Sequence, residues 1–159
     1  MPLVGVVMGS VSDAGVVIET QKQLQDLGIS FEIQTLSAHR VPEQVREYAL
    51  RAEERGIKVF IAEAGGSAAL AGVLASWTTI PVIGVPLASS ELKGLDSLLA
   101  IAQMPPGVPV ACMAVGHWGA RNAAIFAAQI LGVSDEKIKE ACKRERKRLQ
   151  DSYAIKTNS

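Results

Sequence analysis

The fold is decided first by residues 3–13, which read LVGVVMGSVSD. The first six of these form a mostly apolar run, typical of a strand that is buried on both faces of a sheet. Gly9 then allows a tight turn, and two serines and an aspartate follow where a helix can begin. This order of strand, turn and helix start predicts the first βα unit of a parallel sheet.

The alternation of apolar runs and helical patterns continues along the chain. Residues 13–27 carry apolar side chains at helical spacing before Gly28, and Val41-Pro42 opens a second helical segment that ends at Gly56. Further strands are expected at residues 30–36, 59–62, 81–85 and 108–115. The fold class is therefore α/β, as three α/β/α layers around a central parallel sheet, with a flavodoxin-like or another doubly wound order as the natural choice.

An additional C-terminal helix is predicted after the last βα unit. Ser134 can cap it, with Asp135 and Glu136 in its first turn. Its apolar stripe consists of Ile138, Ala141, Cys142 and Leu149, and a neighbouring subunit could cover that stripe. The opposite face is basic, and we interpret it as solvated because acidic residues are interspersed and aromatic ones are not. We expect one domain at residues 1–150 and a frayed tail at residues 151–159.

Composition and charge narrow the possible classes of function. Lys plus Arg and Asp plus Glu both number 16, so a net charge of zero gives no general attraction to nucleic acid or to an anionic membrane. No apolar run approaches the roughly 20 residues of a membrane span, and the N-terminus lacks the pattern of a secretion signal. We therefore expect a cytoplasmic protein with a small-molecule ligand.

The cysteines and histidines do not form a metal-binding pattern. Cys112 and Cys142 lack metal-ligand spacing to each other, and His39 and His117 are isolated in sequence. Since free cysteine is among the most buried residue types, we interpret both cysteines as reduced core residues. No metal site is predicted.

Ligands of an open parallel sheet bind beyond the carboxyl ends of its strands, so the loops after the strands are the places to search. The first loop carries Ser10, Ser12 and Asp13 at a helix N-terminus. Exposed amides there favour a phosphate, and a carboxylate can accept hydrogen bonds from ribose hydroxyls. The same residues would also serve as an ordinary helix cap.

Two further loops carry candidate chemistry. Ser37 and Arg40 flank His39 and can hold an anion, while an imidazole exchanges protons near neutral pH. A lone histidine is more often structural, but these neighbours favour a functional one. Residues 63–69 read EAGGSAA, and the adjacent glycines let backbone amides approach a small anion or carbon dioxide. Their spacing lacks the G-x-G-x-x-G order of a dinucleotide site.

An ordered set of motifs resembles one known family over nearly the whole chain. The motifs are MGSxSD from Met8, SAHR from Ser37, AGG from Ala64, GVP from Gly84, GLDSL from Gly94, QMPxGVPV from Gln103 and NAAxxAAQIL from Asn122. In these motifs the chain is similar to the catalytic subunit of phosphoribosylaminoimidazole carboxylase, also called N5-carboxyaminoimidazole ribonucleotide mutase, the PurE family.

This resemblance implies an enzyme of de novo purine biosynthesis that works as a homo-octamer without a metal or organic cofactor. His39 would move the proton on carbon 4 of the imidazole. The implied contacts with substrate are Ser10, Ser12 and Asp13 on phosphate and ribose, Ser37 and Arg40 on the anion, and Ala64, Gly65, Gly66 and Ser67 around carbon dioxide. The reaction converts N5-carboxyaminoimidazole ribonucleotide to the 4-carboxy isomer by decarboxylation and recarboxylation.

The third loop departs from the pattern of the mutase branch. Ala69 stands where that branch has a second histidine, and Glu63 replaces a glycine. Ser67 and Ala69 lean towards the branch that carboxylates aminoimidazole ribonucleotide directly with carbon dioxide, whereas Arg40 and Gly66 lean towards the mutase. The mutase is therefore our first prediction and the direct carboxylase the second. A paralogue acting on another heterocyclic ribonucleotide, or a non-catalytic nucleotide-binding module, is a further alternative.

Overall fold

The computed structural model describes residues 1–157, with side chains described as far as residue 154. Within these residues the core is a parallel sheet in the order β2-β1-β3-β4-β5. The strands are β1 (Val4–Met8), β2 (Phe31–Thr35), β3 (Val59–Gly65), β4 (Val82–Leu87) and β5 (Ala111–Cys112). The helices are α1 (Ala14–Asp26), α2 (Pro42–Leu50), α3 (Leu70–Trp77), α4 (Leu95–Ala102), α5 (His117–Gly132) and α6 (Glu136–Thr157), with 3-10 turns η1 (Val11–Asp13) and η2 (Glu53–Arg55).

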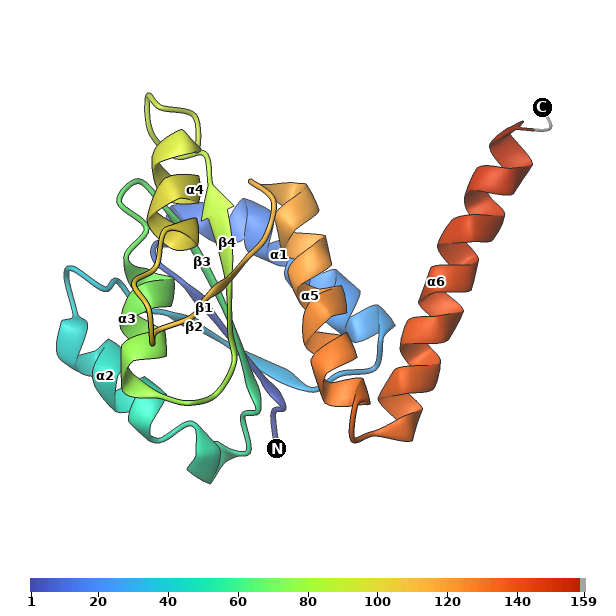
Figure 1. Ribbon diagram of the computed structural model, residues 1–159, viewed down its shortest axis with the longest axis horizontal. Helices are drawn as coiled ribbons and strands as arrows, with labels where there is room; N and C mark the ends of the chain where they lie inside the picture. Colours follow the sequence, from blue (N-terminus) through green and yellow to red (C-terminus); the bar gives the residue numbers. More distant parts are fainter. Residues whose placement is uncertain (158–159) are drawn as a thin grey trace.

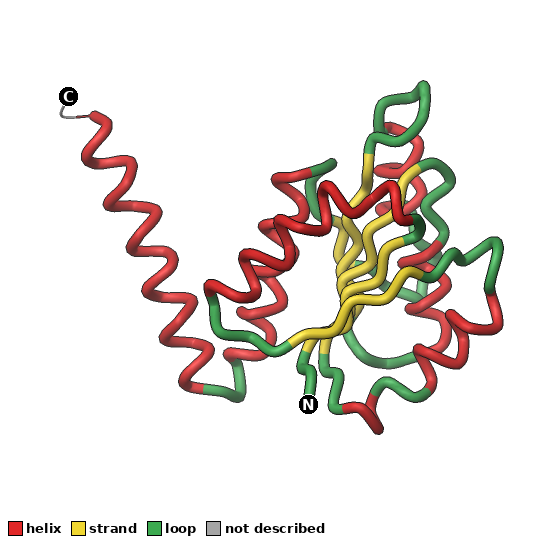
Figure 2. The backbone as a smooth tube through the Cα atoms, turned by 180° about the vertical axis from the view of Figure 1, so that it is seen from behind, coloured by secondary structure: helices red, strands yellow, loops and turns green. Residues whose placement is uncertain are grey.

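Helices cover both faces of the sheet, as the α/β/α prediction requires. Figure 1 shows α1 and α5 on one face and α2, α3 and α4 on the other, and Figure 2 shows the same layers from behind. The chain runs outward from β1 to β2 on one side and to β3 on the other, so the order reverses between β1 and β3. This is the flavodoxin-like order, and the predicted fold class is confirmed.

The middle strands are buried because helices pack on both of their faces. Ile61 of β3 is fully buried and lies in register with Val6 of β1 and Ile83 of β4. Burying one such aliphatic side chain contributes about 1.5–3 kcal/mol. Small residues on α5, among them Ala120 and Ala124, let that helix approach the sheet closely. The sheet is therefore a rigid base for the loops at its carboxyl edge.

The last strand is much shorter than predicted. Residues 108–115 were expected to form it, but β5 comprises only Ala111–Cys112. Pro109 has no N–H to donate to the ladder, and Gly116 takes a positive φ of 74° that ends the extended segment. Contact with β4 continues past the strand through the amide of Met113, which donates to the carbonyl of Gly84 at 2.8 Å.

The cap of α6 also differs from the prediction. The helix is capped by Asp135 and not by Ser134. Asp135 Oδ1 accepts hydrogen bonds from Lys137 N at 2.9 Å and from Ile138 N at 3.2 Å. The Ser134 hydroxyl points back and donates to the carbonyl of Leu131 at 3.5 Å. A carboxylate at this position also has the sign that favours a helix N-terminus.

Helix α6 continues beyond the expected domain boundary at residue 150. An ion pair of 3.3 Å between Lys147 and Asp151 links successive turns, and the Ser152 hydroxyl donates to the carbonyl of Leu149 at 2.7 Å. The segment expected to fray from residue 151 is thus helical to Thr157, and residues 158–159 lie outside the described residues. The helix packs on α5 at its start and then projects away from the body (Figure 1).

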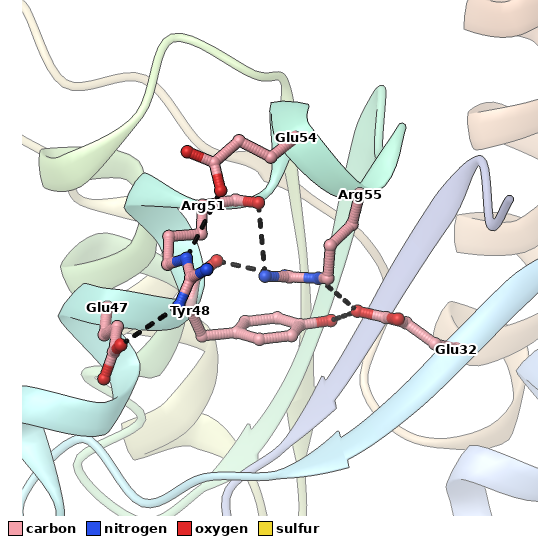
Figure 3. Close-up of polar contacts among 6 residues, drawn as sticks. All are labelled: Glu32, Glu47, Tyr48, Arg51, Glu54 and Arg55. Atoms are coloured by element: carbon pink, nitrogen blue, oxygen red, sulfur yellow. Dashed lines mark hydrogen bonds and ion pairs between the residues drawn. The ribbon is translucent and has the colours of Figure 1, made fainter.

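A polar cluster joins α2 and η2 to the edge strand β2 (Figure 3). Tyr48 donates to Glu32 at 2.7 Å, and Arg55 Nε donates to the same carboxylate oxygen at 3.1 Å. The Arg55 guanidinium also lies over the Tyr48 ring, 4.2 Å from its centroid. Burial and Glu32 raise the pKa of Tyr48, so its hydroxyl stays a donor. The cluster therefore holds α2 and η2 against β2, and β2 and α2 are the two elements that flank the loop carrying His39.

No helix within the described residues is long and apolar enough to cross a bilayer.

Candidate active site

Three loops meet in one pocket at the carboxyl edge of the sheet, at the switch point between β1 and β3. The pocket has a volume of about 400 Å³ and lies where the fold predicts a ligand. Its polar lining comes from the loop after β1, the loop after β2, the segment between β3 and α3, and one serine after β4. The predicted site residues that line it are Ser10, Ser12, Asp13, Ser37, His39, Arg40, Ala64, Gly65 and Ser67.

The first loop is a preformed cap. Ser10 N donates to Asp13 Oδ2 at 2.9 Å, and the Ser10 side chain accepts from the Asp13 backbone, so the two residues form a capping box around η1. Ser10 Oγ also accepts from Ser12 N at 3.3 Å. The Ser12 hydroxyl donates to Ser10 Oγ at 2.9 Å. Gly9 N donates to the carbonyl of Glu63 at 3.1 Å and so anchors the loop to β3. The helix-cap alternative is therefore realised, and the same hydroxyls and carboxylate also face the pocket.

Asp13 is nearly buried in this loop, with 7% of its surface exposed. Burial raises the pKa of its carboxyl, and the hydrogen bond from the Ser10 amide opposes that rise. Its two oxygens can accept further hydrogen bonds from a ligand in the pocket. These features suit a carboxylate that binds neutral hydroxyls such as those of a ribose.

The second loop presents its cationic and imidazole side chains outward. The Ser37 carbonyl accepts from Val41 N at 3.0 Å, and its hydroxyl accepts from Arg40 N at 3.3 Å, which makes a tight turn. His39 and Arg40 are exposed at the rim of the pocket. The imidazole Nε2 lies 3.5 Å from Ser67 Oγ, at the outer limit of a hydrogen bond, so the second and third loops meet at this histidine.

The third loop is shaped by close backbone packing. A Cβ on Gly65 would lie 1.8 Å from Ser89 Oγ, so only glycine fits between β3 and the segment after β4. Gly66 follows with φ +59°, and Ala68 adopts φ +42°, which is rare for a residue with a side chain. Ala69 then stands at the N-cap of α3. The strained turn at Ala68 is held by its amide, which donates to the carbonyl of Gly65 at 3.1 Å.

Glu63 departs from the family pattern in sequence, and its carboxyl group lies beneath this pocket. Glu63 is completely buried, and its Oε1 lies 2.5 Å from the Thr20 hydroxyl of α1. Burial raises the pKa of Glu63 to about 7; the Thr20 hydrogen bond lowers it and the nearby Asp13 charge raises it.

Apart from apolar and glycine neighbours within the three loops, the pocket differs from the sequence-based expectation at Ser89 and Gly66. Ser89, which follows β4, lines the pocket and was not predicted, although a hydroxyl just after a strand end is the kind of residue to search for. Gly66 was predicted, but it is not among the residues that line the pocket and instead supplies the left-handed turn beside it. His117 lies outside the pocket, exposed at the start of α5. Among the described residues, no group of three or more His, Cys, Asp and Glu side chains could hold a metal ion.

The fold and the pocket define a class: an α/β protein with a small-ligand site at its switch point, lined by hydroxyls, amides and one arginine, with a histidine at the rim. A family model described as AIR carboxylase matches residues 3–152. The chain belongs to the AIR carboxylase family.

Individual relatives agree with this membership. The N5-carboxyaminoimidazole ribonucleotide mutase of Pyrococcus abyssi is 55% identical over 150 residues, which cover 94% of this chain and 85% of the relative. The protein of the same name from Thermotoga maritima is 51% identical over 94% of this chain and 86% of its own. A crystal structure of Treponema denticola PurE superposes with a TM-score of 0.87 at 29% identity, covering 98% of this chain and 96% of that one.

Proposed function

We propose that this chain is an N5-carboxyaminoimidazole ribonucleotide mutase of de novo purine biosynthesis, an isomerase that forms the 4-carboxy-5-aminoimidazole ribonucleotide. The observation that carries the proposal is the pocket itself, because it gathers the predicted loops of a chain that is 55% identical to a relative of that name. The substrate is a small phosphorylated molecule, and such a metabolite is expected in the cytoplasm.

The residues of the pocket divide into three binding regions, one from each loop. Ser10, Ser12 and Asp13 bind the phosphate and ribose, since two hydroxyls and a carboxylate lie together in the pocket at the start of η1. Arg40 supplies the cation at the rim, with Ser37 beneath it. The third loop, from Ala64 to Ser67, receives carbon dioxide, because Ala64, Gly65 and Ser67 line the pocket with small residues only.

The chemistry requires one proton to move from carbon 4 to the exocyclic nitrogen. When the N–C bond of the carbamate breaks, carbon dioxide leaves and the nitrogen takes a proton. Carbon 4 of the electron-rich ring then attacks the retained carbon dioxide, and the new C–C bond forms before the ring proton leaves. His39 can supply the first proton and accept the second, since an imidazole does both near neutral pH. Holding carbon dioxide against the ring makes the recapture effectively unimolecular.

The assembly is part of the proposal. Large apolar side chains lie exposed near the carboxyl edge of the sheet, including Leu92, Leu95 and Leu99, and a groove of about 500 Å³ between α5 and α6 includes Val133 and Cys142. A monomer would leave this surface in water. A closed homo-oligomer, which the family resemblance sets at eight subunits, would cover it.

A turnover assay tests the activity. The purified protein is given N5-carboxyaminoimidazole ribonucleotide alone, or aminoimidazole ribonucleotide with bicarbonate, and formation of the 4-carboxy product is followed for each. Efficient conversion of the first substrate at low bicarbonate supports the mutase. Conversion of the second alone would make the chain a direct carboxylase, and conversion of neither would show a binding module or a paralogue with another substrate.

A further inference from the structure

Among the described residues, Glu63 is the one buried acidic side chain that the proposed chemistry does not use. It extends from β3 towards α1 and α5, with no exposed surface. No Lys or Arg within the described residues forms an ion pair with it, and its Oε2 has no hydrogen-bond partner among them. A buried carboxylate without a cation is costly, whereas a neutral carboxylic acid in the same place is not.

The hydrogen bonds around Glu63 show which form fits. Thr20 Oγ1 lies 2.5 Å from Glu63 Oε1 and 3.0 Å from the carbonyl oxygen of Ala120 on α5. A threonine hydroxyl has a single proton, so it cannot donate to both oxygens. Both contacts are hydrogen bonds only when the carboxylic acid donates to Thr20 and Thr20 donates to Ala120. The neutral acid thus completes a chain from β3 through α1 to α5.

The hydrogen-bonded series Glu63, Thr20 and Ala120 lies directly beneath the loop that carries Asp13. The Glu63 carbonyl accepts from Gly9 N, and Asp13 and Thr20 stand seven positions apart, which places them on the same face of the helical segment that faces the sheet. Two neighbouring carboxyl groups avoid a double negative charge when one of them keeps its proton. Asp13 has the Ser10 amide to stabilise its charge, and Glu63 has no such donor besides Thr20.

We propose that Glu63 is a positioning residue that stays protonated as a neutral acid, so that Asp13 stays ionised to bind the ribonucleotide. Above neutral pH, Glu63 of the free protein loses its proton. Binding of a phosphorylated ligand adds negative charge to this region, so under these conditions Glu63 takes up a proton when the ligand binds. Ligand affinity then falls once Glu63 ionises. The role of Asp13 rests on the proposed function, whereas the protonation of Glu63 in the free protein does not.

Few other charged groups can act on Glu63. On α1, Glu19 and Lys22 pair with each other at 3.6 Å. On α5, His117 and Arg121 are exposed. Neither β1 nor β4, the strands on either side of β3, contains an ionisable side chain. Asp13 is therefore the titratable neighbour that matters, in agreement with its effect on the pKa of Glu63.

Infrared spectroscopy of the free protein tests the protonation directly. The carbonyl stretch of a carboxylic acid is separate from that of carboxylates, and exposed carboxyls are ionised at pH 6.5. The wild type should show the acid band at this pH and lose it as the pH rises above about 7. Glu63→Gln should abolish the band, while Asp13→Asn and the exposed-site control Glu53→Gln should retain it. No acid band in the wild type, or a band that survives Glu63→Gln but not Asp13→Asn, would overturn the assignment.

Calorimetry with aminoimidazole ribonucleotide tests the consequence for binding. Proton uptake is measured from the dependence of the binding heat on the ionisation heat of the buffer. At pH 8 the wild type should take up more protons than Glu63→Gln and bind up to about tenfold more weakly than at pH 6.5, with a flatter profile for the variant. Equal proton uptake and equal pH profiles in the two proteins would refute the link to binding. If no form binds this ligand, the proposed function fails, and the infrared result still decides the state of Glu63.

Discussion

At the scale of single residues, the site combines a buried floor with an exposed rim: Asp13 is nearly buried, whereas His39 and Arg40 are open to solvent. The buried carboxylate is fixed by the Ser10 amide. His39 has one side-chain neighbour at hydrogen-bond distance, Ser67 at 3.5 Å. Binding and proton transfer are thus assigned to different side chains, and substitutions should separate them.

His39→Asn should remove turnover while leaving ribonucleotide affinity within a few-fold of the wild type, because asparagine keeps a polar side chain but cannot exchange a proton near neutral pH. A loss of at least about 100-fold in kcat is expected for a lost general acid and base. Steady-state turnover and calorimetric binding provide the two readouts. His117→Asn is the matched control, since His117 is exposed on α5 outside the pocket, and it should be fully active. Substantial turnover by His39→Asn would remove its catalytic role.

Arg40→Ala and Asp13→Ala should instead weaken binding. Each loses charge-assisted hydrogen bonds to the ligand, which corresponds to about 10- to 100-fold in Kd. Titration calorimetry measures the change, and Arg51→Ala, an exposed arginine on α2 outside this pocket, serves as the control. An unchanged Kd in both variants would show that the phosphate and ribose lie elsewhere.

Most of these residues could be predicted from the sequence because they follow strand ends in short loops, where fold alone fixes their neighbourhood. Ser10, Ser37 and Ser67 meet for that reason. Ser89 also follows a strand end and could have been sought there, but its close packing against Gly65 depends on the tertiary fold and could not be read from the sequence. The partner of Glu63 was equally hidden, since Thr20 lies 43 positions away and contacts it through tertiary packing.

At the scale of elements, periodicity located the strands and helices, and local chemistry decided their ends. The strands β1 to β4 lie where the apolar runs predicted them. The fifth was overestimated, because Pro109 and Gly116 limit an apolar segment that composition alone would extend. Strand order could not be read from the sequence, since it depends on which apolar faces pack together and not on any one segment.

The start of α6 offers a clean test of local capping. Asp135→Ala should destabilise the protein by about 1 kcal/mol, because two amides at the helix start lose their acceptor. Ser134→Ala should change stability by a few tenths of that amount, since its hydroxyl only reaches the carbonyl of Leu131. Chemical denaturation of both variants, at one protein concentration, makes the comparison. A larger effect of Ser134→Ala would reverse the assignment of the cap.

At the scale of the whole molecule, the single chain leaves much apolar surface uncovered. Trp118, Leu92 and Val11 are 81%, 62% and 73% exposed. Helix α6 projects from the body beyond its contact with α5 (Figure 1). Light scattering at micromolar concentration should therefore give a homo-oligomer, with a mass close to eight times the 16.8 kDa of one chain. A monomer at that concentration would contradict the proposed assembly.

The assembly also bears on how carbon dioxide is retained, because the pocket is open at its rim in one chain. A mutase must keep the carbon dioxide released from its own substrate, whereas a direct carboxylase must admit it from solution. Ala69, at the N-cap of α3, lines this part of the pocket, and a histidine there would narrow it and add a donor. If the smaller side chain governs retention, some carbon dioxide should escape and be replaced from solution.

The test supplies unlabelled carbamate substrate in labelled bicarbonate and measures label in the 4-carboxy product. We expect label to enter the product of the wild type and Ala69→His to reduce it, after correction for spontaneous carbamate breakdown and for product re-exchange. Ala69→Ser is a control that adds a polar group of small size, and it should retain most of the exchange. Efficient turnover with negligible label in the wild type would mean that the remaining residues, together with neighbouring subunits, already close the pocket. The absence of a histidine at position 69 would then have no bearing on the carbon source.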